Sequence, residues 1–355
     1  MRLAGPPFLA LVAGMENRLQ WGILGAGTIA GTFAKGVARS QSGTVVAVGS
    51  RDASKAAEFA ARHSIARAHG SYEALLADPE VRAVYIATPH PQHLEWILKA
   101  AAAGKHILCE KPLAMNAAQA AQAIDACRAA GVLLMEAFMY RCHPQTKKLL
   151  QVVRSGLIGD LQLVQATFSF NAPFDPDHRL FNLELGGGGI LDVGCYTTSI
   201  ARLLAGVASG LPYEDPEYLE GTAVLHPESG VDTLAAATLR FGNGVLAQLS
   251  CGVSLHQESM VRVYGSGGWI LVTDPFLPNV DGGVSRMQAY LAGGKCPEMI
   301  RVESGPLYAM EADAFAAALA KGLREVPENP TGDTLGNMRT LDRWRAAIGL
   351  RYPCE

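Results

Sequence analysis

Short runs of β-branched and aliphatic residues alternate with alanine-rich amphipathic stretches over roughly the first 140 residues. Five short, continuously apolar runs predict buried strands. They are residues 21–25, 44–50, 83–88, 106–110 and 132–138. The stretches between them have helical periodicity, and several end at a glycine, a common helix stop. They are residues 28–40, 54–64, 91–104 and 116–131. Strands and helices that alternate at this pitch predict βαβ units around a parallel sheet.

The pattern changes near residue 140. After this point the chain predicts helices at about 144–155 and 192–205, strands at 161–172, 232–242, 244–253, 258–266 and 269–274, and closing amphipathic helices at 311–323 and 334–350. The sequence Gly242-Asn243-Gly244 between two of these strands is a hairpin signal. The fold class is therefore predicted to be α/β followed by α+β, with an open, mostly antiparallel second sheet that carries helices on one face.

Composition narrows the class of protein. A chain of 355 residues is long enough for about two domains, and 49% apolar with 18% charged residues is typical of a globular protein. The formal net charge of −3 gives no indication of a nucleic-acid partner, and no apolar run approaches the length of a membrane span. The seven cysteines have no C-x-x-C spacing, so we predict neither a disulfide framework nor a metal site. Reduced thiols indicate a cytoplasmic protein.

The first residues weakly resemble a targeting segment. Arg2 precedes an apolar stretch, but this stretch is short and is interrupted by Pro6 and Pro7. Met15 stands just ahead of the first predicted strand. We interpret residues 1–14 as a dispensable extension or the product of an upstream start codon, and export remains the alternative.

A glycine motif lies between the first predicted strand and the helix that follows it. It reads G-x-G-x-x-A, with Gly25, Gly27, Thr28, Ile29 and Ala30. The first glycine permits a tight turn, the second lets backbone N–H groups approach a pyrophosphate, and the small alanine lets helix and strand pack closely. This context predicts a dinucleotide-binding site.

The end of the second predicted strand indicates which dinucleotide binds. An acidic residue at this position would bind the ribose 2′-hydroxyl of NAD. Here the strand ends in Ser50-Arg51-Asp52, and the planar fork of Arg51 suits a 2′-phosphate, with Lys55 close enough to assist. Asp52 is expected to cap the next helix, with Ser54 as the competing residue. We predict NADP as the cofactor, with NAD possible.

Two further groups of residues carry candidate chemistry. Glu110-Lys111-Pro112 follows a predicted strand, at the edge of the sheet where α/β proteins bind ligands. Asp192 and Tyr196 are four residues apart, so a helix would place them on one face. The four glycines of residues 186–189 precede them, and these would allow another backbone or a ligand to come close.

At these residues the sequence resembles the Gfo/Idh/MocA family of oxidoreductases. The resemblance covers about residues 19–350, through GILGAGTIA, SRDASKAAEFA, ATPHPQHLEW, EKPLAMN, MEAFMYRCHP and GGGILDVGCY. Position 196 is His in the inositol dehydrogenase branch but Tyr here, as in the branch of dimeric dihydrodiol dehydrogenase and NADP-dependent D-xylose dehydrogenase. The resemblance implies an N-terminal extension (1–18), an NAD(P)-binding Rossmann domain (19–140), and a substrate-binding and oligomerisation domain (141–355).

The resemblance also implies roles for single residues. Lys111 would lie beside the nicotinamide, Glu110 and His93 near the cofactor, and Asp192 against the substrate. Thr88 and Pro89 would lie against the nicotinamide end.

Alcohol oxidation needs a base for the hydroxyl proton, and two residues are candidates. Tyr196 would need a neighbouring cation to favour the phenolate, which Lys111 would supply, or Lys111 would itself transfer the proton. Both alternatives remain open, and Lys111, Asp192 and Tyr196 are the predicted catalytic residues. The predicted substrate-binding residues are Asp192 together with Arg141, His143, His178 and Arg179, and Phe174 would line the mouth of the site.

The predicted function is NADP-dependent hydride transfer to or from a sugar, a cyclic polyol or a trans-dihydrodiol. Alternatives within the family are a reductase of ketosugars or anhydrosugars and an NAD-dependent glycosidase, and a non-catalytic nucleotide-binding regulator is the alternative outside catalysis. The expected partners are a small carbohydrate-like molecule and a second copy of the chain, in a homodimer or a dimer of dimers.

Overall fold

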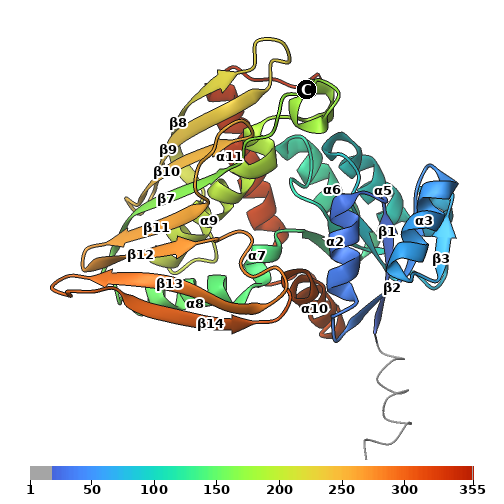
Figure 1. Ribbon diagram of the computed structural model, residues 1–355, viewed down its shortest axis with the longest axis horizontal. Coiled ribbons are helices and arrows are strands. Elements are labelled where there is room, and N and C mark those ends of the chain that lie inside the picture. The colour runs from blue at the N-terminus through green and yellow to red at the C-terminus, as the bar shows by residue number, and fades with distance from the viewer. Residues whose placement is uncertain (1–17, 354) are drawn as a thin grey trace, which may run out of the picture.

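The computed structural model describes residues 18–353 and residue 355 (Figure 1). Residues 1–17, which include the predicted extension up to residue 14, and Cys354 lie outside the described residues. Within the described part of the chain the strands form two sheets, of six and eight strands. The predicted fold class is confirmed.

The first sheet is parallel throughout, in the order β3-β2-β1-β4-β5-β6. Its strands are β1 (Leu19–Leu24), β2 (Gly43–Gly49), β3 (Arg67–His69), β4 (Ala83–Ile86), β5 (His106–Cys109) and β6 (Leu134–Glu136). The helices of this part are α2 (Thr28–Val37), α3 (Ala53–His63), α4 (Tyr72–Leu76), α5 (His93–Ala102) and α6 (Ala117–Ala130). The strand order reverses between β1 and β4, and at such a point the loops beyond the carboxyl ends of the strands form a ligand crevice.

The second sheet has the order β14-β13-β12-β11-β7-β10-β9-β8. Its strands are β7 (Leu161–Ser169), β8 (Pro216–Leu225), β9 (Asp232–Phe241), β10 (Leu246–Gly252), β11 (Met260–Gly265), β12 (Gly268–Thr273), β13 (Gly283–Leu291) and β14 (Glu298–Ser304). The helices are α7 (Met139–Cys142), α8 (Pro144–Arg154), α9 (Cys195–Ala208), α10 (Leu307–Ala320) and α11 (Thr331–Ala347). Strands β7 and β10 pair in parallel and the other neighbours are antiparallel, so the sheet is mostly antiparallel, as predicted.

One face of the second sheet is covered by helices. Helices α9 and α11 pack against it and lie between this sheet and the first one (Figure 1). Exposure alternates along the strands, as the 43% exposed Leu246 and the fully buried Ala247 of β10 show. The two closing helices also return to the first half of the chain, because α10 packs on α2 and α11 packs on α6. The closing helices therefore join the second half of the described chain back to the first half.

The helical segment Leu183–Ala208 is long and apolar enough to cross a membrane by length and composition, with a mean hydropathy of 1.3. Its most apolar part is completely buried in the folded protein. A helix between two layers needs apolar side chains all round, and this position accounts for its composition.

Candidate active site

The glycine turn after β1 leaves an open helix N-terminus. Gly25 has φ +106°, and a Cβ there would lie 2.9 Å from the Ala87 carbonyl oxygen, so glycine is required. A Cβ on Gly27, the N-cap of α2, would meet nothing within 4 Å. Thr28, at the start of α2, is exposed, whereas Ala30 is fully buried. Free N–H groups that face open space suit a pyrophosphate.

The end of β2 presents two cations. Arg51 and Lys55 are both exposed. Asp52 is the N-cap of α3 and accepts hydrogen bonds from the backbone N–H groups of Ser54 (2.9 Å) and Lys55 (3.2 Å). The capping role predicted for Asp52 is confirmed, and the carboxylate is thereby occupied within the chain. Ser50 is buried, and its hydroxyl accepts the backbone N–H of Asp52 at 3.2 Å.

The loop after β4 has a polar atom without a partner. Thr88 is 6% exposed and its hydroxyl has no hydrogen-bond partner in the described structure, whereas Pro89 is half-buried. A buried hydroxyl at this edge fits the polar end of a nicotinamide. Together with the open turn and the cations after β2, it shows that the residues present fit NAD(P).

His93 joins two loops of the crevice. It is fully buried, and its ring nitrogens lie 2.8 Å from the Thr88 carbonyl oxygen and 2.9 Å from that of Pro112. Because both nitrogens face backbone carbonyls, His93 offers no free nitrogen to a ligand. It holds the loops after β4 and β5 together, and Lys111 lies in the second of these loops.

Lys111, in the loop after β5, contacts both Asp192 and Tyr196. Its ammonium donates to the Asp192 backbone carbonyl at 2.7 Å and lies 3.5 Å from the Asp192 carboxylate, with 15% of its side chain exposed. It also lies 5.1 Å from the ring centroid of Tyr196, over the ring. The Glu110 carboxylate accepts hydrogen bonds from the backbone N–H of Lys111 at 3.2 Å and from the hydroxyl of Tyr85. The three predicted catalytic residues are thus brought together.

The charges in this cluster shift the pKa values of Lys111 and Asp192 in opposite directions. Burial opposes the charge of Lys111, but the neighbouring Asp192 carboxylate outweighs it and raises the pKa of the ammonium. Burial likewise opposes ionisation of Asp192, yet Lys111 and Arg179 hold the pKa of that carboxyl well below its usual range. Arg179 donates to the Asp192 carboxylate at 2.9 Å from a 45% exposed side chain. The pair is therefore a charged ammonium and a charged carboxylate.

Tyr196 does not present its hydroxyl to Lys111. The side chain is 3% exposed, and the hydroxyl donates to the Met139 sulfur at 3.5 Å. Aromatic rings of Phe138, Phe168 and Phe276 surround it, with centroids 5.0, 5.3 and 5.4 Å from its own. Burial, followed by the nearby Glu110, raises the pKa of this phenol well above its usual value. The Lys111 ammonium lies over the ring of Tyr196, and the raised pKa of the phenol disfavours the phenolate that one of the two alternatives requires. Which residue transfers the proton stays a prediction.

The glycine run packs against the chain itself. A Cβ on Gly187 would lie 2.7 Å from the carbonyl oxygens of Arg179 and Leu180. A Cβ on Gly189 would lie 3.1 Å from the Cα of Gly252. Of the two alternatives left open by the sequence, close backbone approach is the one observed. The run leads into a π-helical turn, Ile190–Gly194, which holds Asp192 and continues into α9.

Three predicted substrate-binding residues lie outside the cluster. Arg141 is buried, and its guanidinium donates to Asp333 (2.7 Å), the Glu328 carbonyl (3.0 Å) and Ser199 (3.3 Å). His143 is fully buried and caps α8, and burial lowers its pKa to about 4. His178 is exposed and caps a short 3₁₀ turn. All three hold local structure, and only Arg179 reaches Asp192.

One residue of the cluster was not predicted. His90 follows Pro89 in the loop after β4, is 7% exposed, and its Nδ1 has no hydrogen-bond partner in the described structure. Burial, with the charges of Lys111 and Arg179 nearby, holds its pKa well below the usual value, so the ring is neutral. The sequence did contain a signal for His90, because this residue stands between two prolines just after the carboxyl end of β4.

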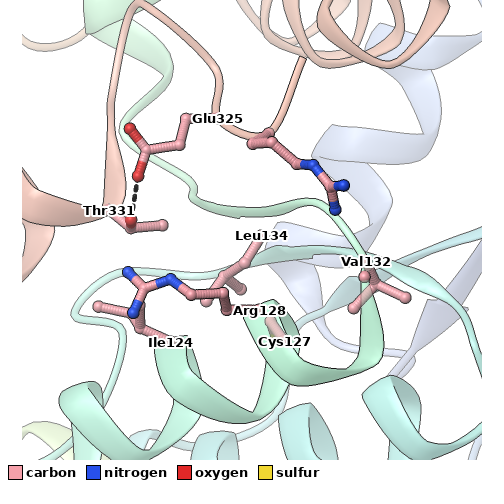
Figure 2. A pocket seen from close by; sticks show the side chains of 9 residues that line it. Ile124, Cys127, Arg128, Val132, Leu134, Glu325 and Thr331 are labelled. Carbon is pink, nitrogen blue, oxygen red and sulfur yellow. Dashed lines mark hydrogen bonds between the residues drawn. The ribbon is translucent and has the colours of Figure 1, made fainter. Parts of the chain in front are cut away.

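A pocket of about 290 Å³ lies away from this cluster, between α6 and the turn before α11 (Figure 2). Arg128 and Cys127 line it from α6, and a hydrogen bond joins Glu325 and Thr331 on its other side. No predicted site residue lines it.

Comparison with known proteins identifies the family. Residues 19–138 match the model described as an oxidoreductase family with an NAD-binding Rossmann fold, and residues 146–271 match the GFO/IDH/MocA C-terminal domain. The chain belongs to the Gfo/Idh/MocA oxidoreductase family. It is thus an oxidoreductase with an NAD-binding Rossmann domain, and the resemblance inferred from the motifs is confirmed.

Individual family members are similar over nearly the whole chain. A trans-1,2-dihydrobenzene-1,2-diol dehydrogenase of Mus musculus is 34% identical over 94% of this chain and 98% of its own length. A D-xylose 1-dehydrogenase (NADP(+)) of Haloferax volcanii is 34% identical over 91% and 95%, respectively. The structure of a 3-ketoreductase from Actinomadura kijaniata with NADP and TDP-benzene is 28% identical, with a TM-score of 0.83 over 94% of this chain and 98% of that one.

Proposed function

We propose that the protein transfers a hydride between NADP and the CH–OH carbon of a sugar, a cyclic polyol or a trans-dihydrodiol. The single observation that carries this proposal is the Lys111 ammonium, held at the carboxyl end of β5 between the Asp192 carboxylate and the face of Tyr196. The similar dehydrogenases act, by their names, on a trans-diol and on D-xylose, and both compounds carry adjacent hydroxyl groups. A cation beside a carboxylate matches such a pair, because one group donates and the other accepts.

Each residue has a proposed task. NADP, when bound, supplies the carbon that accepts or donates the hydride. Lys111 moves the proton at the reacting oxygen, as a general acid in reduction and a general base in oxidation. Asp192 keeps the ammonium in place and accepts a hydrogen bond from a substrate hydroxyl, while Arg179 keeps Asp192 ionised. Tyr196 and its aromatic neighbours form an apolar wall that excludes water.

The charge of Lys111 favours one direction of proton transfer. A lysine with a raised pKa is protonated at neutral pH, so it is ready to donate to a carbonyl oxygen. In the oxidising direction it must first lose this proton, so the oxidation rate is expected to rise with pH. Reduction of a ketosugar, the alternative predicted from the family, is therefore chemistry that the same residues support.

NADP is proposed over NAD because the second strand ends in exposed cations. Arg51 and Lys55 are free to meet a 2′-phosphate, whereas the carboxylate of Asp52, which would bind a ribose diol, already caps α3. The bound NADP of the similar 3-ketoreductase supports this choice.

The decisive experiment is a steady-state assay against a substrate panel. Aldoses, cyclic polyols and trans-dihydrodiols would be offered with NADP or NAD, and ketosugars with NADPH or NADH. We expect NADP-dependent turnover of at least one class, with product and reduced cofactor formed in equal amounts. Turnover without net cofactor reduction would indicate the glycosidase alternative, and cofactor binding without any turnover would indicate a regulator.

We further propose that the protein forms a homodimer through the uncovered face of the second sheet. We also propose that it is located in the cytoplasm. Tyr264, Trp269 and Tyr290 stack across three neighbouring strands on this face, with centroid distances of 5.7 and 4.0 Å. Exposed apolar side chains on other strands of the sheet add to it: Tyr218, Val224, Leu246, Val284 and Met299. An apolar face of this extent is typical of a protein interface. The six described cysteines are free thiols, which fits a reducing compartment.

A further inference from the structure

Asp232 is a buried carboxylate that contacts the segment carrying Asp192. It is the first residue of β9 and is fully buried. Its Oδ2 accepts the backbone N–H of Ile190 at 2.7 Å, and Ile190 is the first residue of the π-helical turn. Its Oδ1 has no hydrogen-bond partner in the described part of the chain. The side chain thus caps, from a neighbouring strand, the N-terminus of the helix that carries Asp192 and Tyr196.

Two glycines of the run leave the space that this carboxylate occupies. A Cβ on Gly188 would lie 2.1 Å from Oδ1, and one on Gly189 would lie 3.3 Å from Oδ2. Gly188 also has φ +111°, a conformation that favours glycine. These contacts explain why glycine is needed at positions 188 and 189. A side chain at either position would displace the Asp232 carboxylate from the Ile190 N–H.

The same short turn is held at its other side by Lys111. The Asp192 backbone carbonyl, two residues after Ile190, accepts the Lys111 ammonium at 2.7 Å. Asp232 therefore fixes one end of a turn whose other end contacts the proposed proton-transfer group. A small shift of this turn would change both contacts between Asp192 and Lys111.

The carboxylate has no stabilising ion pair of its own. Asp232 forms no salt bridge within the described residues, and Arg345, whose charge acts on it, is paired with Asp342 (2.6 Å) and Glu355 (2.7 Å). Burial raises the pKa of Asp232 to about 7. A buried carboxyl group without an ion pair is costly for the fold, and the hydrogen bond that its side chain makes is to Ile190 of the Asp192 turn.

We propose that Asp232 is a positioning residue for the reaction: by capping the helix at Ile190 it places Asp192 against Lys111. This inference rests on the proposed dehydrogenase function. Asp232 is on the second sheet and does not contact the residues that fit the cofactor, so it acts on catalysis and leaves NADP binding unchanged.

The test compares Asp232→Asn with Asp232→Ser. Asparagine keeps an oxygen at the same distance from Ile190, whereas serine is too short to reach it. We expect D232S to lose roughly 10- to 100-fold in kcat, as for a reacting group displaced by about 1 Å, and D232N to retain most of its kcat. The Kd for NADP should match wild type in both variants, and active sites are counted by NADP binding so that any unfolded fraction is excluded.

The control is Asp313→Asn, which removes a carboxylate that accepts from Ser40 (2.6 Å) and Ser42 (2.5 Å), away from Lys111. It should lower the Tm without a loss in kcat per NADP site. A kcat for D232S equal to that of wild type would overturn the proposal, and so would a loss in D232N as large as that in D232S.

A second measurement needs no substrate. Hydrogen exchange, followed by mass spectrometry, is expected to speed up in D232S for the peptide that spans residues 186–196, but not in peptides of the first sheet. Unchanged exchange in this peptide overturns the positioning role, even if the panel finds no substrate. Faster exchange together with a failed panel leaves the helix contact standing and rejects only the dehydrogenase function.

Discussion

Lys111 and Tyr196 differ in what their surroundings do to their charge. The ammonium has a carboxylate and a carbonyl as neighbours, so its charged form is favoured despite burial. The phenol has aromatic rings and a thioether around it, so its neutral form is favoured. Proton transfer requires a group that reaches the substrate oxygen, and these surroundings are the reason for proposing Lys111 in that role.

Cofactor choice is also decided by single residues. Replacing Arg51 with Ala should weaken NADP binding more than NAD binding, because only NADP has a 2′-phosphate for the guanidinium. A hydrogen bond to a charged group contributes about 1.5–3 kcal/mol, so the Kd for NADP should rise roughly 10- to 100-fold. Titration of both nucleotides by tryptophan fluorescence gives the two constants. If both Kd values rise equally, Arg51 does not bind the phosphate.

The sequence identified those site residues whose position in a motif determines their position in space. Lys111 and Thr88 follow strands of a parallel sheet, and all such loops meet at one edge. Arg141 also follows a strand, but its side chain reaches Asp333, 192 residues later, a contact that no local pattern encodes. Asp232 was missed for the same reason, since its partner Ile190 lies 42 residues earlier.

At the scale of elements, buried strands were easier to predict than strands that expose much of their length. Strands β1, β2, β4, β5 and β6 were predicted within a few residues, since each is a continuous apolar run. Strands β3, β8 and β14 lie at sheet edges and expose much of their length, and the partly exposed β13 lies next to an edge. A half-exposed strand has a weak apolar signal, so all four were missed. The domain boundary near residue 140 remains a prediction.

A buried glutamate connects β6 to the Lys111 loop and should affect stability. Glu136 is 1% exposed and accepts the Leu113 N–H at 2.9 Å, and burial raises its pKa to about 7. Because this folded pKa is above the unfolded value near 4.5, the folded protein binds the proton more tightly. The contribution of Glu136 to stability is therefore full below about pH 4.5 and falls by roughly 3 kcal/mol as the pH rises to 7.

Glu136→Gln removes this titration and keeps an oxygen for Leu113. We expect the free energy of unfolding in urea to fall less between pH 5 and pH 8 in the variant than in wild type. Glu58→Gln, on the exposed face of α3, is the control and should keep the wild-type slope. Parallel pH profiles for E136Q and wild type would show that Glu136 does not titrate in this range.

A buried ion network joins the helices around the site. Asp333 of α11 accepts Arg141 of α7 at 2.7 Å and also pairs with Arg202 of α9, and all three side chains are buried. Asp333→Leu leaves the buried Arg141 without its carboxylate and leaves Arg202 with Asp215 alone, so it should cost about 3–5 kcal/mol in the free energy of unfolding. Asp125→Asn breaks the exposed pair with Arg128 and should change it by less than about 1 kcal/mol. Equal urea midpoints for the two variants would contradict this account.

At the scale of the whole molecule, the uncovered sheet face predicts the assembly. Trp269 lies 4.0 Å from Tyr290, ring centroid to centroid, on that face. Trp269→Glu places a charge on that face and should convert a dimer to a monomer. The control is Leu323→Glu, at an exposed position on the turn after α10, and it should leave the dimer intact. Sedimentation velocity gives the masses. A dimer that persists in W269E, with the Tm of wild type, would place the interface elsewhere.

The active site itself is assembled across the whole chain. Lys111 comes from the first sheet, and Asp192 and Tyr196 come from the segment that packs under the second. The closing helices α10 and α11 return to α2 and α6, so the last residues hold these two halves together. We propose that this assembly makes Lys111 the proton-transfer group and Tyr196 part of the apolar wall.

The most direct test is kcat for Lys111→Met and Tyr196→Phe on the best substrate of the panel, with Lys99→Met, an exposed lysine of α5, as the control. We predict a loss of about 10²–10⁴-fold in K111M, the usual contribution of acid–base catalysis, with an unchanged Kd for NADP. Y196F should lose far less, and K99M should match wild type. A loss in Y196F as large as that in K111M, with NADP binding intact, would contradict the account and make the tyrosine hydroxyl the group that transfers the proton.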